Sequence, residues 1–149
     1  MFIVDCLIGN TDRHNGNFGF IKNIKTEELI LAPIYDCGLC LFSIFTDEKM
    51  KEVLDNEGLL RDCIKNTSSA IKYNGSKIKY YDFITSLKNE DCIEALTRIY
   101  PKIDIEKINP IIDDIPCITD IRKEFYKTII KYKYEDILKV AYKQKCKVK

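Results

Sequence analysis

Nine residues near the start of the chain, from Gly9 to Asn17, read Gly-Asn-Thr-Asp-Arg-His-Asn-Gly-Asn. A segment so rich in turn-forming residues predicts a loop and excludes a regular helix or strand at this place. The apolar residues 1–8 precede it, and we expect them to form a short buried helix or the end of one.

Two apolar runs follow the loop, at residues 18–21 and 29–34, and a polar stretch rich in Lys, Asn and Glu joins them. This pattern predicts a β-hairpin. Pro33 near the end of the second run is typical of a strand that is finishing. Residues 35–41, around Asp-Cys-Gly, predict a second loop.

The remainder of the chain is predicted to be mainly helical. We expect short helices at 47–55 and 59–66, and longer ones at 82–99, 104–115 and 119–143. The last helix has an apolar stripe at helical spacing: Ile121, Phe125, Ile129, Tyr132, Ile137, Val140 and Ala141. Residues 65–80 contain the turn signal Asn74-Gly75 and predict either a small hairpin or an ordered loop.

A chain of 149 residues fits one domain. Within it, residues 1–41 hold the two loops and the hairpin, and residues 42–149 are expected to form a mainly helical bundle. The predicted fold class is therefore mainly α with a small β-hairpin.

The charge is balanced, with 24 Lys and Arg against 23 Asp and Glu. A general nucleic-acid binder needs a marked basic excess, so direct nucleic-acid binding is not expected. Five lysines and no acid occupy the segment from Lys139 to Lys149. We interpret this segment as a solvated helix end, with a contact to anionic lipid or nucleic acid as the alternative.

Seven cysteines cannot all pair, and residues 1–8 lack the basic flank and cleavage site of a secretory signal. No run approaches the roughly 18 apolar residues of a membrane span. We therefore expect a cytoplasmic protein with reduced thiols and no membrane partner. The pair Cys37-x-x-Cys40 has no second pair to complete a zinc site, which favours small buried apolar side chains.

Three polar residues have a spacing that points to chemistry. Asn17 follows Asp12 by five residues, and Asp36 follows it by 24, after the predicted hairpin. Phosphoryl transfer needs a carboxylate that orients the attacking hydroxyl and accepts its proton, and oxygen ligands that hold Mg²⁺ on the phosphates of ATP. Protein kinases arrange an Asp, an Asn and a second Asp in this order. The pattern predicts a kinase-like phosphotransferase.

Two segments carry a more specific resemblance. Asn-Thr-Asp-Arg-His-Asn-Gly-Asn-Phe-Gly-Phe-Ile at residues 10–21 is similar to the catalytic loop of HipA-like serine/threonine kinases, and Ala-Pro-Ile-Tyr-Asp-Cys-Gly at 32–38 resembles their metal-binding segment. His14 lies two residues after Asp12, an arrangement that phosphoinositide kinases share. The continuation Phe-Gly-Phe-Ile and the Tyr-Asp pair favour the HipA-like group, and a phosphoinositide-kinase-like fragment is the lesser alternative.

The resemblance implies the C-lobe of a kinase fold and assigns roles to individual residues. Asp12 is expected to be the catalytic base, and Asn17 and Asp36 the Mg²⁺ ligands beside ATP. Asn10 and His14 are expected to support the loop, and Arg13 to position it or to face solvent. The implied substrate is a Ser or Thr of a protein.

Only eleven residues precede Asp12, and no Gly-rich phosphate loop or Walker pattern occurs in the chain. We therefore expect little activity without an N-terminal ATP-binding lobe, which a second chain would supply. The alternative is a non-catalytic interaction module, or a relic of a toxin–antitoxin kinase, that binds an N-lobe chain or an antitoxin-type regulator.

Overall fold

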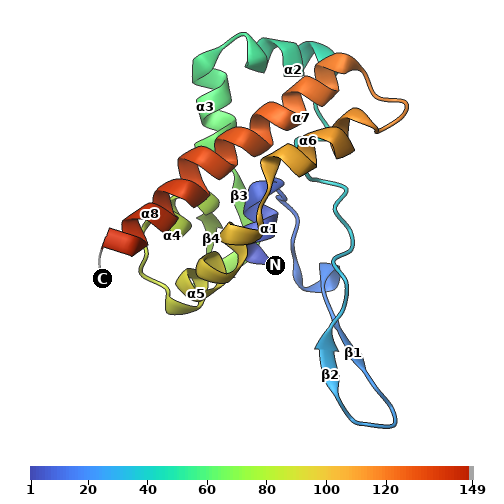
Figure 1. Cartoon of the computed structure of the whole chain (residues 1–149), viewed down its shortest axis with the longest axis vertical. Coiled ribbons are helices and arrows are strands. Elements are labelled where there is room, and N and C mark those ends of the chain that lie inside the picture. Colours follow the sequence, from blue (N-terminus) through green and yellow to red (C-terminus); the bar gives the residue numbers. More distant parts are fainter. Residues whose placement is uncertain (148–149) are drawn as a thin grey trace.

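The computed structural model describes residues 1–147. It has a helical body from which one hairpin protrudes (Figure 1). The body contains α1 (Phe2–Leu7), α2 (Asp47–Leu54), α3 (Glu57–Lys65), α4 (Tyr80–Thr85), α5 (Glu90–Ile99), α6 (Ile105–Asp113), α7 (Asp120–Lys133) and α8 (Val140–Lys147). The predicted fold class, mainly α with a small β-hairpin, is confirmed.

The protruding hairpin pairs β1 (Phe20–Lys22) with β2 (Leu29–Leu31). Its strands are shorter than predicted, and every one of their residues is exposed. A second antiparallel hairpin pairs β3 (Ser68–Tyr73) with β4 (Ser76–Lys79), which resolves the alternative left open for residues 65–80. Asn74 and Gly75 both have positive φ, as a two-residue type I′ turn requires.

The predicted helix at 82–99 is wrong, because two helices occupy this region. α4 ends at Thr85, and α5 begins only at Glu90. Between them Leu87 adopts a φ of 51°, and the Asn89 side chain accepts a hydrogen bond from Cys92 N at 2.8 Å as the N-cap of α5. A left-handed residue and a new cap together end one helix and start another.

The long C-terminal helix is continuous but not uniform. α7 passes into the π-helix η3 (Tyr134–Lys139) and then into α8. In an α-helix a row of residues four apart drifts around the axis by about 40° per step, and the wider π turn offsets this drift. The row Phe125, Ile129, Lys133, Ile137 and Ala141 is therefore buried throughout. Tyr132 and Val140 of the predicted stripe are each 37% exposed instead.

The core surrounds α7 and η3 and takes side chains from α1 to α6. It includes Ile3 and Cys6 of α1, Met50 and Val53 of α2, Ile64, Tyr80, Ile84, Leu96 and Ile112. α1 therefore lies inside the body, as predicted for residues 1–8. Of the basic C-terminal segment, Lys149 lies outside the described residues.

Within residues 1–147, none of the helices combines the length and the apolar character that crossing a bilayer requires.

Candidate active site

The predicted catalytic loop is anchored by a residue of α1 that sequence analysis did not single out. Asp5 is 0% exposed and accepts hydrogen bonds from Asn10 Nδ2 at 2.9 Å and Arg13 Nη2 at 3.0 Å. An acid inside an otherwise apolar helix is the one signal that the sequence offered, because such an acid is buried only with partners. Asp5 thus ties two loop residues to the core.

Arg13 is fully buried, so the alternative that it faces solvent is wrong. Its guanidinium pairs with Asp5, and this hydrogen bond raises the Arg13 pKa above the usual value for arginine. Nη1 also donates to the backbone oxygens of Asn17 and, at 2.7 Å, Tyr35. One cation therefore holds the predicted catalytic loop against the residue that precedes Asp36.

The backbone of Asp12 is fixed on both sides. Its N–H donates to Asn10 Oδ1 at 3.0 Å, and its carbonyl oxygen accepts a hydrogen bond from Asn17 Nδ2 at 2.8 Å. The carboxylate itself remains 43% exposed. His14 Nε2 lies 3.9 Å from it, too far for a hydrogen bond. A fixed backbone with an accessible carboxylate is what a positioned general base requires.

His14 acts on the loop locally. Its Nδ1 accepts a hydrogen bond from Gly16 N at 3.0 Å at the start of the 3₁₀ turn η1 (Asn15–Asn17), and the ring is exposed. This contact agrees with the predicted role in shaping the loop. A core position for this histidine is excluded.

Two tyrosines hold the loop from outside. The Tyr80 hydroxyl, which is buried in the core, donates to Asn10 O at 2.6 Å, and Tyr35 Oη donates to Gly16 O at 3.1 Å. Tyr80 lies 70 residues after Asn10, so no local pattern could have predicted this contact. Through it the helical body supports the loop that carries Asp12.

Asp36, near the start of the second loop, is exposed and has a φ of 53°. Asn and Asp tolerate this left-handed conformation better than most residues, but it still costs energy and often marks functional sites. Asp36 and Asn17 lie on the two segments that the Arg13 guanidinium joins. Neither side chain contacts the other through a hydrogen bond within residues 1–147.

The donor set at this place fits Mg²⁺ held jointly with phosphates. Asn17 is 4% exposed and uses Nδ2 on Asp12, which leaves its Oδ1 without a donor among the described residues. No group of three His, Cys, Asp or Glu in the described chain could hold a metal ion by itself. Mg²⁺ commonly takes only one or two carboxylates and completes its shell with water and substrate phosphates.

The two cysteines of the Cys37-x-x-Cys40 pair were predicted to be buried, and only one of them is. Cys40 is buried, which raises its pKa to about 12, but Cys37 is exposed. Arg13 Nη2 lies 3.6 Å from Cys37 Sγ. Both cysteines are free thiols, and they belong to the loop that the guanidinium holds.

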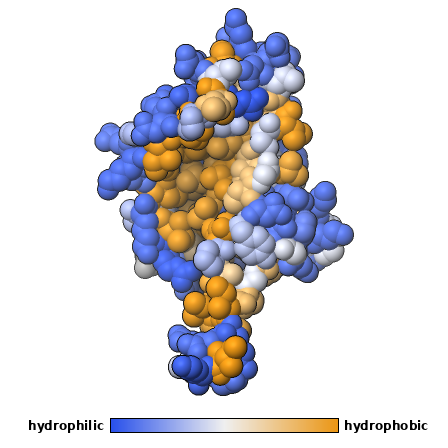
Figure 2. Space-filling view, turned by 90° about the vertical axis from the view of Figure 1, so that its right-hand side faces the viewer, coloured by the Kyte–Doolittle hydropathy of each residue, from blue (hydrophilic) through white to orange (hydrophobic). Residues whose placement is uncertain are grey.

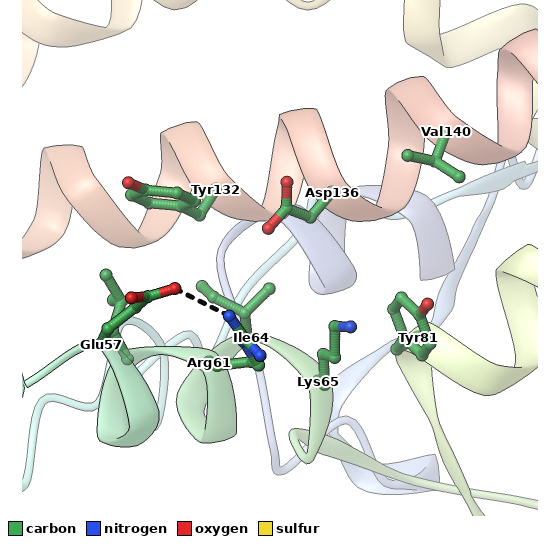
Figure 3. Close-up of a pocket in the computed structure, with 9 residues that line it drawn as sticks. Glu57, Arg61, Ile64, Lys65, Tyr81, Tyr132, Asp136 and Val140 are labelled. Carbon is green, nitrogen blue, oxygen red and sulfur yellow. Dashed lines mark hydrogen bonds and ion pairs between the residues drawn. The ribbon is translucent and has the colours of Figure 1, made fainter.

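A separate cavity of about 420 Å³ lies between α3 and the continuous helical segment formed by α7, η3 and α8 (Figure 3). Ile64 and Val140 face it from opposite helices, with Arg61, Lys65 and Asp136 around them. None of its lining residues belongs to either predicted loop, so this cavity is not the site of the predicted chemistry.

Comparisons with known proteins agree with this geometry. The chain is 44% identical over 144 residues to the serine/threonine-protein kinase CtkA of Helicobacter pylori strain J99, which makes the two proteins homologous. The crystal structure of CtkA, described as a proinflammatory kinase, superposes with a TM-score of 0.93 at 43% identity over 99% of this chain. The kinase-like fold is thereby confirmed. No protein-family model matches the chain.

The match does not extend over the whole relative. The chain spans 44% of the CtkA sequence and 55% of the chain in the crystal structure.

Proposed function

We propose that this chain provides the catalytic and metal-binding loops of a HipA-like kinase that transfers phosphate from ATP to a Ser or Thr of a protein. The observation that carries the proposal is the loop at Asp12, whose backbone is fixed on both sides while its carboxylate stays accessible. Homology to CtkA supports the reaction class, and the motifs at residues 10–21 and 32–38 support the HipA-like family.

In this proposal Asp12 orients the acceptor hydroxyl and receives its proton. Asn17 Oδ1 and the Asp36 carboxylate would hold Mg²⁺, which neutralises charge on the transferred phosphoryl group. Arg13 does not touch the reactants. It keeps the two loops at a fixed separation through Asn17 O and Tyr35 O, and such positioning supplies much of the rate in phosphoryl transfer.

We further propose that activity requires an ATP-binding lobe from outside residues 1–149. The chain matches about half of CtkA, and its hairpin exposes apolar side chains beside the site: Phe20, Ile21, Leu29, Ile30 and Leu31. Figure 2 shows apolar surface on the protruding hairpin at the bottom of the molecule, and above it a hollowed, largely apolar surface on the body. Surfaces of this kind usually contact another protein segment.

The test is a fusion of the CtkA segment that this chain does not match with residues 1–149. With Mg²⁺ and radiolabelled ATP, the fusion should label Ser or Thr of a generic protein acceptor, and Asp12→Asn should reduce labelling by about 10² to 10⁴-fold. Residues 1–149 alone should show little labelling. Full labelling by the Asp12→Asn fusion would remove Asp12 from the role of base.

A fusion that folds and binds ATP but never transfers phosphate would favour the interaction module. In that case Asp12→Asn should also leave partner binding unchanged.

A further inference from the structure

A second hollow lies directly beside the catalytic loop. It has a volume of about 400 Å³, and Thr11, the neighbour of Asp12, is part of its wall. The other walls come from the end of α3 and from the β3–β4 hairpin. The lining combines apolar surface, including that of Phe42 and Cys63, with the hydroxyl, amide and ammonium groups of Asn66, Thr67, Ser68, Ser69 and Lys77. This chemistry suits the backbone and side chains of a bound polypeptide.

The hairpin beside the hollow carries an unbalanced positive charge. Residues 66–80 contain Lys72, Lys77 and Lys79 and no acid. Lys72 and Lys77 are direct cross-strand partners. Like charges in such a pair are destabilising. Within residues 1–147 neither of them is in an ion pair, although eight other lysine or arginine side chains form one. The arrangement costs stability in the free protein and becomes favourable when an anion binds.

Another cation lies behind the wall of the hollow. Lys133 is fully buried, and its Nζ donates to Thr67 Oγ1 at 2.9 Å and lies 3.4 Å from the carbonyl oxygens of Cys63 and Ile64. No carboxylate pairs with it among the described residues. Thr67 and Cys63 belong to the lining, so the ammonium group lies just behind the wall.

One acid, Asp62, also lines the hollow. It accepts a hydrogen bond from Asn66 Nδ2 at 2.7 Å, and Asn66 Oδ1 accepts one from Lys79 Nζ at 2.7 Å. Its charge is therefore partly offset by Lys79, and Lys72, Lys77 and Lys133 remain without a partner of opposite charge.

We propose that this hollow and the β3–β4 hairpin bind an acidic segment of the polypeptide that accepts the phosphate. The inference rests on the proposed kinase function, because it identifies the class of acceptor for the same site. Bound here, Asp or Glu side chains of the acceptor would lie against Lys77 and Lys72. The chain next to them would pass Thr11 and bring a Ser or Thr hydroxyl to Asp12.

The test is a titration of the isotopically labelled chain with a short synthetic peptide in which glutamates flank one serine, followed by NMR without ATP. Amide signals of Thr11, residues 66–69 and Lys77 should shift, and added salt should weaken binding. The double variant Lys72→Ala/Lys77→Ala should bind roughly tenfold more weakly, because two ion pairs with the peptide are lost and exposed ion pairs are individually weak. Lys143→Ala on α8 is the matched control and should bind like the wild type.

Three results would overturn the proposal. They are equal binding of the same peptide with lysines in place of glutamates, shifts confined to α8, and tighter binding of a single-stranded oligonucleotide at the same residues. The double variant should unfold at the same or a slightly higher temperature than the wild type, so loss of folding cannot explain loss of binding. The peptide is titrated without ATP, so its binding does not depend on phosphate transfer by the fusion protein. A failure of peptide binding can therefore be told apart from a failure of the proposed kinase activity.

Discussion

The buried ion pair between Asp5 and Arg13 joins the core to both loops of the candidate site. Removing one partner of such a pair leaves the other charge buried without compensation, which typically costs about 3–5 kcal/mol. We therefore expect Asp5→Asn to lower the free energy of unfolding by about 3 kcal/mol. Glu57→Gln is the matched control, because Glu57 pairs with Arg61 on the surface. Urea unfolding measures both, and equal effects of the two changes would contradict the structural role of Asp5.

Lys133 offers a test by pH, since burial lowers its pKa below the usual 10.5. Between the lowered pKa of the folded state and about 10.5, the unfolded chain binds more protons at this residue than the folded chain. Stability from this group therefore rises with pH across that window and is lost as pH falls. The neighbouring Cys6 thiol stays neutral there, because burial raises its pKa to about 12.

The corresponding measurement compares the wild type with Lys133→Met from pH 7 to pH 10. The wild type should gain stability relative to this variant as pH rises. The exposed Lys131 provides the control, and Lys131→Met should show no such pH-dependent difference. A difference for Lys133→Met that is independent of pH would show that the ammonium group is not destabilised by burial.

At the residue scale, the sequence predicts the groups whose relation is local in the chain. Asp12, Asn17 and Asp36 belong to two loops that one short hairpin separates, so their spacing and the motifs around them made them candidates. Asp5 and Tyr80 were missed because their roles depend on burial and on a contact across 70 residues. The same holds for Arg13, whose burial follows from the position of α1 and not from its neighbours.

At the scale of elements, the hairpins and most helices were predictable because period and turn residues are local signals. The break at residues 86–89 was missed, although Asn89 is a strong cap and precedes two acids. Apolar residues at helical spacing on both sides of Leu87 favoured one continuous helix, and the left-handed conformation of Leu87 has no sequence signal. The π-helix η3 was also missed. A π turn contains more residues than an α turn, and here the packing of the helix against the core, which the sequence does not show directly, favours the wider turn.

The break between α4 and α5 gives a prediction of its own. Asn89→Ala removes the side-chain acceptor for Cys92 N, and the loss of such a cap costs about 1 kcal/mol. The free energy of unfolding should fall by that amount. Gln144→Ala, an exposed amide within α8, should leave it unchanged. If Asn89→Ala also proved neutral, α4 and α5 would not depend on this cap to separate.

At the scale of the whole molecule, the fold leaves several large apolar side chains exposed on the β1–β2 hairpin and on the helical body. The strands of the β1–β2 hairpin are exposed throughout, and Ile44 and Ile111 are 77% and 67% exposed. A groove of about 370 Å³ with Val4, Leu7 and Ile108 in its wall lies next to Ile111. Ile44, Ile111 and the strand residues of the β1–β2 hairpin do not belong to the hydrophobic core, so their surface is available to another protein segment.

The hairpin gives the clearest test of that surface, because Ile21 and Ile30 are direct cross-strand partners at 50% and 52% exposure. The double variant Ile21→Lys/Ile30→Lys should keep the unfolding midpoint, since neither side chain belongs to the core. It should reduce the binding of a hydrophobic dye, and it should lower phosphate transfer by the CtkA fusion. Ile111→Lys changes the groove and leaves the β1–β2 hairpin intact, so it tests the two surfaces separately. If it abolishes transfer while the hairpin variant does not, the ATP-binding lobe contacts the groove and not the hairpin.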